Sequence, residues 1–178
     1  MCRRPHLLAA SLSAPGLDAA IDTRGRRIHA ERPRRRVRQR GVVLSGPRKA
    51  CPVVLRKTAG RIEVLAFRHP PAGCQLVKGT IEAAETIQGA AERELLEESG
   101  ILGTAIDYLG TAQMTEPDQE WHFVVCRVGR LAETWTHRKS DGGLDFEFFW
   151  HPINQEPNET WHSLFKQALA FIHQYIEP

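Results

Sequence analysis

The chain has 178 residues, enough for one domain with a substantial core and too few for two comfortable domains. Hydrophobic residues make up 42% and charged residues 25%, as in an average globular protein, and no apolar run approaches the roughly 18 residues that span a bilayer. The formal charge of +3 conceals a division, because residues 1–40 carry eleven arginines against three acidic residues, a net charge of +8, and the rest carries −5.

The basic segment 1–44 is predicted to be disordered, because its peak RPRRRVRQR follows no sustained apolar period and offers no core. Three interpretations of it compete: a patch for nucleic acid or another anionic surface, a targeting peptide, and a tail without a dedicated role. We therefore place one folded domain at residues 45–178. The four cysteines form no C-x-x-C pair and no zinc spacing, which favours free thiols in a reducing, cytoplasmic compartment.

From about residue 48 the sequence becomes rich in β-branched and aromatic residues. Six runs are predicted to be strands, at residues 49–58, 61–69, 74–77, 104–110, 121–128 and 144–150. The first two flank Ala59-Gly60, which predicts a hairpin between them. In the last run, acidic residues alternate with aromatic ones, so we expect one acidic and one aromatic face.

Two helices are predicted between and after these strands. The first covers residues 86–99, follows a loop at 79–85 and ends at Gly100. The second is C-terminal, with Asn158 as its N-cap. Its apolar stripe consists of Trp161, Leu164, Phe165, Ala168, Ile172 and Tyr175. Strands interspersed with two helices indicate an α/β or α+β sandwich.

The first predicted helix lies in a segment, residues 79–101, that holds six glutamates and a single arginine. At 100° per residue, Glu94, Glu97 and Glu98 fall within an arc of about 100° that also contains small and apolar residues. If this side packs on the sheet, three carboxylates lie together at the edge of the core. Carboxylates clustered without histidine or thiol partners suit a hard ion, Mg²⁺ or Mn²⁺. The alternative is a solvated acidic face.

The spacing in this segment is G-x5-E-x7-R-E-L-x-E-E-x-G-I, and every fixed position matches the Nudix box. The chain thus resembles the Nudix hydrolases over these 23 residues, and its order of strands and helices is similar from about residue 45 onward. The resemblance implies an α/β/α sandwich with a central mixed sheet. It also implies a metal-dependent enzyme that hydrolyses the pyrophosphate linkage of a nucleoside diphosphate joined to another moiety, by attack of water on phosphorus.

The resemblance also implies roles for particular residues. Glu94, Glu97 and Glu98 would bind the metal with the carbonyl of Gly79, and Arg93 would pair with Glu85 to hold the loop against the helix. The general base stays open among Glu97, Glu98, Glu116, Asp118, Glu120 and Asp141. Some relatives take a further metal ligand from a strand after the box, which makes Glu120 a candidate ligand as well.

Residues outside the box bear on the substrate, which is expected to be a small molecule derived from a nucleotide. Lys78 would contact a phosphate, or would be an ordinary exposed lysine, and Trp121 and Trp150 would stack on a base or pack in the core. Pro117 points to ADP-ribose hydrolases, whereas VKG before the box points to enzymes acting on triphosphates or dinucleoside polyphosphates. The alternative class is a non-catalytic Nudix-fold module that binds nucleotide or RNA, the latter through the basic segment. No membrane partner is expected.

Overall fold

The computed structural model describes residues 46–138 and 143–176, which lie within one compact unit, Val42–Pro178. The basic segment 1–44, predicted to be disordered, and Asp141 lie outside the described residues. The helices are α1 (Ile87–Ser99) and α2 (Ser163–Ile176). The strands are β1 (Arg48–Val53), β2 (Leu55–Thr58), β3 (Arg61–His69), β4 (Gly73–Gln75), β5 (Gly79–Thr80), β6 (Gly103–Met114), β7 (Gln119–Val128), β8 (Trp135–Arg138) and β9 (Asp145–Pro152).

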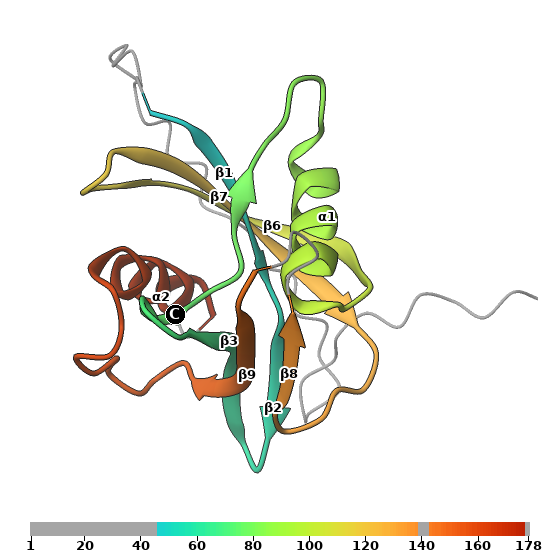
Figure 1. The fold of residues 1–178 in the computed structure, drawn as a ribbon, viewed down its shortest axis with the longest axis vertical. Coiled ribbons are helices and arrows are strands. Elements are labelled where there is room, and N and C mark those ends of the chain that lie inside the picture. Colours follow the sequence, from blue (N-terminus) through green and yellow to red (C-terminus); the bar gives the residue numbers. More distant parts are fainter. Residues whose placement is uncertain (1–45, 139–142, 177–178) are drawn as a thin grey trace, which may run out of the picture. The chain divides into compact units, whose positions relative to one another are not determined.

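The strands form two sheets with a helix packed on either side, which confirms the predicted mixed α/β fold (Figure 1). The first sheet has the order β5-β1-β7-β6 and is mixed, because β1 runs parallel to β7 while the other pairs are antiparallel. The second sheet is antiparallel, with the order β2-β3-β9-β8 and β4 added to β3. The strands thus divide into two sheets, where the sequence led us to expect one central sheet.

The core divides into two clusters, one beneath each helix. α1 contributes Ala90, Ala91 and Leu95 to the first cluster, and the buried side of α2 belongs to the second. Trp121 is fully buried in the second cluster and contacts Phe165 of α2 edge to face, with 5.5 Å between ring centroids. Trp121 therefore packs in the core and is not available for base stacking.

The predicted first strand, residues 49–58, is in fact two strands in different sheets. β1 pairs with β7 and ends at Val53, and β2 forms the predicted hairpin with β3. Residues 50–54 are buried throughout, as is typical of a parallel strand that is covered on both faces. A continuous apolar run of this kind gives no local signal for the point at which the chain changes sheet.

Two short strands were missed, and both depend on distant partners. β8 pairs with β9, and β5, within the predicted loop 79–85, pairs with β1. Runs of four and two residues are too short to show an alternation. The alternation expected in β9 is confirmed, because its phenylalanines at 146 and 148 are buried while Asp145 and Glu147 are exposed.

The predicted N-cap of α2, Asn158, is wrong. The helix begins at Ser163, and the side chain of Asn158 instead accepts a hydrogen bond from the Thr160 amide at 3.1 Å. The intervening residues are drawn toward β4, because the Cys74 amide donates to the Thr160 carbonyl and Cys74 bridges to Trp161. This pairing extends the loop by several residues before the helix starts.

Local signals placed α1 well. The Thr86 hydroxyl accepts from the Gly89 amide at 3.0 Å, and Gly100 ends the helix in the left-handed conformation, with φ of 74° and its N–H bonded to the Leu96 carbonyl. None of the helices in the part of the chain that the structure describes has the length and apolarity needed to cross a lipid bilayer.

Candidate functional site

Two of the three box glutamates on α1 face the sheet. Glu94 and Glu98 are each only 7% exposed, whereas the side chain of Glu97 is 44% exposed. The Glu94 carboxylate lies against Gly79 of β5 so closely that a Cβ built on Gly79 would be 1.7 Å from its carboxyl carbon. The Glu98 carboxylate accepts a hydrogen bond from the Lys78 amide at 3.3 Å. Lys78 and Gly79, which precede the helix in the chain, thus contact these two carboxylates directly.

Replacing Gly79 with alanine is expected to displace the Glu94 carboxylate, because the new methyl group would occupy its place. Because the displaced atoms are the flexible end of the Glu94 side chain, the expected cost is the loss of its hydrogen bond to Arg93, about 1–3 kcal/mol of folding free energy. Thermal unfolding should show the loss. The matched control is Gly129→Ala, since a Cβ at Gly129 meets nothing within 4 Å. Equal stability of the Gly79 and Gly129 variants would contradict the close packing of Glu94 on this strand.

Arg93 is the positive charge of the box and bonds three of its carboxylates. Its Nε and Nη2 donate to the two oxygens of Glu85 at 2.8 and 2.9 Å, and its Nη1 donates to Glu94 at 2.8 Å and to Glu97 at 3.0 Å. Nη2 also donates to the carbonyl of Thr80 at 3.0 Å. The predicted contact between Arg93 and Glu85 is therefore present, and it is bidentate.

These contacts favour the charged forms of both partners. The Arg93 guanidinium holds the pKa of the Glu85 carboxyl below its usual value, and Glu85, followed by Glu94, raises the pKa of Arg93. Glu85 also accepts from the Glu82 amide at 3.0 Å. The loop before α1 is thus bonded to Arg93 of the helix by a side chain, that of Glu85, and by a backbone group, the Thr80 carbonyl.

Two lysines lie beside the buried carboxylates, and only one of them was predicted. Lys78 directly precedes the box and is half-buried. Lys49 of β1 was missed; its Nζ donates to the Thr80 hydroxyl at 2.7 Å. Burial, followed by the positive charge of Lys78, lowers the pKa of Lys49, while Glu94 and Glu98 act in the opposite direction. No sequence signal marked Lys49, because its proximity depends on the pairing of β1 with β5.

Glu120 of β7 belongs to a separate polar cluster. Its carboxylate lies 3.3 Å from Arg48 Nε and 2.8 Å from Nε2 of His122, whose Nδ1 lies 2.9 Å from the Tyr108 hydroxyl. Burial lowers the pKa of His122, and Glu120 acts in the opposite direction. Sequence reasoning singled out Glu120 but not the arginine and histidine that hold it.

The other candidates from the sequence lie apart from the box. Glu116, Pro117 and Asp118 lie in the exposed turn between β6 and β7, where Asp118 contacts Gln113. Trp150 lies on β9 beneath the guanidinium of Arg56, 4.3 Å from the ring centroid. The indole of Trp150 is thus engaged by an arginine, away from the box.

The box residues fit a divalent ion in the type of their donor atoms. Their oxygens are those of carboxylates and a backbone carbonyl, which are the ligands of Mg²⁺ and Mn²⁺. The absent Cβ of Gly79 makes room for Glu94. Within the described residues, no three acidic, histidine or cysteine side chains converge closely enough to hold an ion. Glu97 is bonded to Arg93 and its side chain is 44% exposed, so it would have to leave that contact to join the other two carboxylates.

The comparisons with known proteins agree with this geometry. The NUDIX domain profile matches residues 41–170. Among solved structures, the Ap4A hydrolase of C. elegans superposes with a TM-score of 0.53 at 19% identity, covering 74% of this chain and 98% of that one. The MutT protein from Methanosarcina mazei Go1 gives 0.53 at 17% identity, covering 77% and 100%. An ADP-ribose pyrophosphatase from Streptococcus suis gives 0.54 at 11% identity, covering 75% and 94%. The search of curated proteins gave no match.

Proposed function

The chain belongs to the Nudix family, and from that premise we propose that it is a pyrophosphohydrolase acting on a nucleoside diphosphate joined to another moiety. The observation that carries the proposal is the pair of nearly buried carboxylates, Glu94 and Glu98, packed against β5 and the residue before it. Buried carboxylates need compensating positive charge; Arg93 already supplies part of it to Glu94, and the proposed divalent ion would supply more.

Under this proposal, Glu94 and Glu98 would hold a divalent ion, with Glu97 and the Gly79 carbonyl as further ligands, and Glu120 would join them only by leaving its contacts with Arg48 and His122. Such an ion, Mg²⁺ or Mn²⁺, would neutralise charge on phosphate oxygens and activate water for attack on phosphorus. Glu97 and Glu98 are the proposed acceptors of the proton of that water.

The remaining residues of the site bind and orient. Lys49 is close enough to Lys78, Glu94 and Glu98 to interact with their charges, and the proposed role of both lysines is to contact the oxygens of a substrate phosphate. Burial lowers the pKa of Lys49, and an added anionic partner would favour its charged form. Arg93 and Glu85 fix the loop relative to the helix and so position the carboxylates.

The substrate is to be identified by screening nucleotide sugars, ADP-ribose, dinucleoside polyphosphates, NADH and nucleoside triphosphates with Mg²⁺ or Mn²⁺, with product identification. The expected result is hydrolysis of one class at the pyrophosphate linkage. The solved relatives include an Ap4A hydrolase and an ADP-ribose pyrophosphatase, so both classes belong in the panel. Salt-sensitive binding of RNA with no turnover of any compound would instead support a non-catalytic module.

A further inference from the structure

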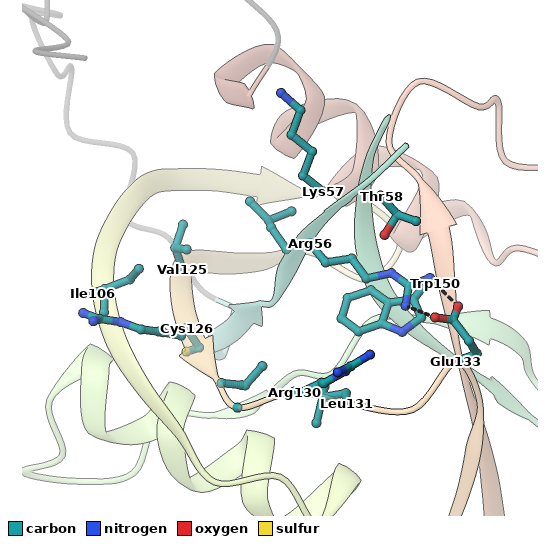
Figure 2. Close-up of a pocket in the computed structure, with 14 residues that line it drawn as sticks. Arg56, Lys57, Thr58, Ile106, Val125, Cys126, Arg130, Leu131, Glu133 and Trp150 are labelled. Atoms are coloured by element: carbon teal, nitrogen blue, oxygen red, sulfur yellow. Dashed lines mark hydrogen bonds and ion pairs between the residues drawn. The ribbon is translucent and has the colours of Figure 1, made fainter. Parts of the chain in front are cut away.

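A hollow of the described surface lies away from the box, where the two sheets separate. β1 and β7 run side by side as far as Val53 and Val125, after which the chain crosses at Val54 into the second sheet as β2. β2 and the end of β7 therefore diverge, and a cavity of about 690 Å³ lies between them (Figure 2). Small-molecule sites usually have volumes of about 300–1,000 Å³.

The cavity is separate from the box. None of its lining residues lies between 79 and 101. Gly79 is aligned with Ala50 of β1, which is aligned with His122 of β7. The lining of the cavity starts at Val125 and continues past Val128. At about 3.3 Å per residue, these positions are about 10–20 Å farther along the strand.

One wall of the cavity is a fixed stacking surface. The guanidinium of Arg56 lies over the Trp150 ring, and its two Nη atoms donate to the carboxylate of Glu133 at 2.8 and 2.6 Å (Figure 2). Its Nε donates to Glu63 at 2.7 Å. The indole nitrogen of Trp150 donates to the Ala132 carbonyl at 3.1 Å. Both flat groups are thus held by several contacts, and guanidinium and indole planes are favourable surfaces for planar rings.

The rest of the lining combines apolar residues with unpaired positive charge. Val125, Val128 and Leu131 are half-buried. Lys57, Arg127 and Arg130 also line the cavity, and in the described part of the chain none of these three has an ion-pair partner. The acidic residue of the lining, Glu133, is already neutralised by Arg56. The cavity therefore presents a net positive charge around an apolar and aromatic interior.

We propose that this cavity is a second binding site, distinct from the box, for a nucleotide-sized anion with a planar ring and a phosphate group. The ring would lie against the Arg56 guanidinium, which covers the Trp150 ring, and the apolar side chains, and the phosphate would contact Arg127 and Arg130. The positive charges and the stacking surface come from different lining residues, so a ligand that carries both parts should bind more tightly than either half. The site goes beyond the proposed hydrolysis and does not require it.

The test is calorimetric titration of the full chain with adenosine monophosphate in excess chelator, so that no divalent ion supports binding at the box. Inorganic phosphate and adenosine are titrated separately as the two halves. We expect saturable binding of the nucleotide that is tighter than that of either half. Arg127→Gln combined with Arg130→Gln should raise Kd at least tenfold, about 1.4 kcal/mol. Both arginines are exposed, so the variant should fold.

Two controls separate this site from the proposed catalytic one. Lys166→Gln removes a positive charge on α2, far along the chain from the cavity lining, and should leave Kd unchanged. Glu98→Gln should also leave it unchanged, whatever its effect on turnover. The proposal would be overturned by the absence of saturable binding, by equal Kd values for the double variant and the parent, or by a loss of binding in Glu98→Gln.

Discussion

Arg93→Ala is expected to lower the free energy of unfolding by about 2–3 kcal/mol and to reduce turnover sharply. The substitution leaves three carboxylates, those of Glu85, Glu94 and Glu97, without the guanidinium that bonds them all. Glu94 is nearly buried, and a buried charge that loses its partner is costly. Denaturant unfolding at neutral pH measures the stability, and the loss should include the contact with the Thr80 carbonyl.

The pH dependence of this effect has a definite sign. Because Arg93 lowers the pKa of Glu85 from 4.5, the contribution of the pair is complete above about pH 4.5 and is lost as the pH falls through the lowered value. The difference between parent and variant should therefore shrink in acid. Arg93→Lys is the control, since it keeps the charge but not the bidentate geometry. Its free energy of unfolding should lie between those of the parent and Arg93→Ala. A variant as stable as the parent at pH 7 would show that the arginine contributes nothing.

Glu98→Gln is expected to cut turnover by about 10²-fold or more, the usual cost of removing a catalytic charge stabiliser. It should also reduce the rise in Tm that Mg²⁺ or Mn²⁺ causes in the parent, because an ion that binds the folded chain stabilises it by mass action. The amide keeps an acceptor for the Lys78 N–H, so without metal the two proteins should differ in stability by under about 1 kcal/mol.

The control for this variant is Glu82→Gln. Glu82 lies in the same acidic segment but is exposed. The Glu82→Gln variant should therefore have the turnover and the metal-induced Tm shift of the parent. Equal turnover of Glu98→Gln and the parent at limiting Mg²⁺ would remove Glu98 from the metal site. Equal losses in both variants would indicate that only the total charge of the segment matters.

The features that the sequence predicted well are those with local causes. α1 is determined by signals within its own segment. These are the spacing of the box residues, the Thr86 hydroxyl at its start and the left-handed Gly100 at its end. The Arg93–Glu85 pair is what the resemblance to the Nudix box implied, and both residues lie in one loop-and-helix unit. The hairpin around Ala59-Gly60 is equally local.

The features that the sequence did not predict depend on contacts between distant segments. Lys49 joins the box because β1 pairs with β5, and Glu120 is held by Arg48, 72 positions earlier in the chain. α2 starts later than predicted because the Thr160 carbonyl accepts a hydrogen bond from β4. The cavity beside Trp150 exists because the chain changes sheets at Val54. No periodicity within a single segment encodes such pairings.

The central claim is that water attacks a phosphorus atom of a pyrophosphate linkage, and hydrolysis in water labelled with heavy oxygen tests it most directly. The substrate found in the screen is turned over by the full chain with Mg²⁺, and the products are analysed by mass spectrometry. We expect one labelled oxygen in a phosphate group of one product and none in the other, with no turnover in excess chelator. Label outside the phosphate groups, or turnover that persists without a divalent ion, would contradict it.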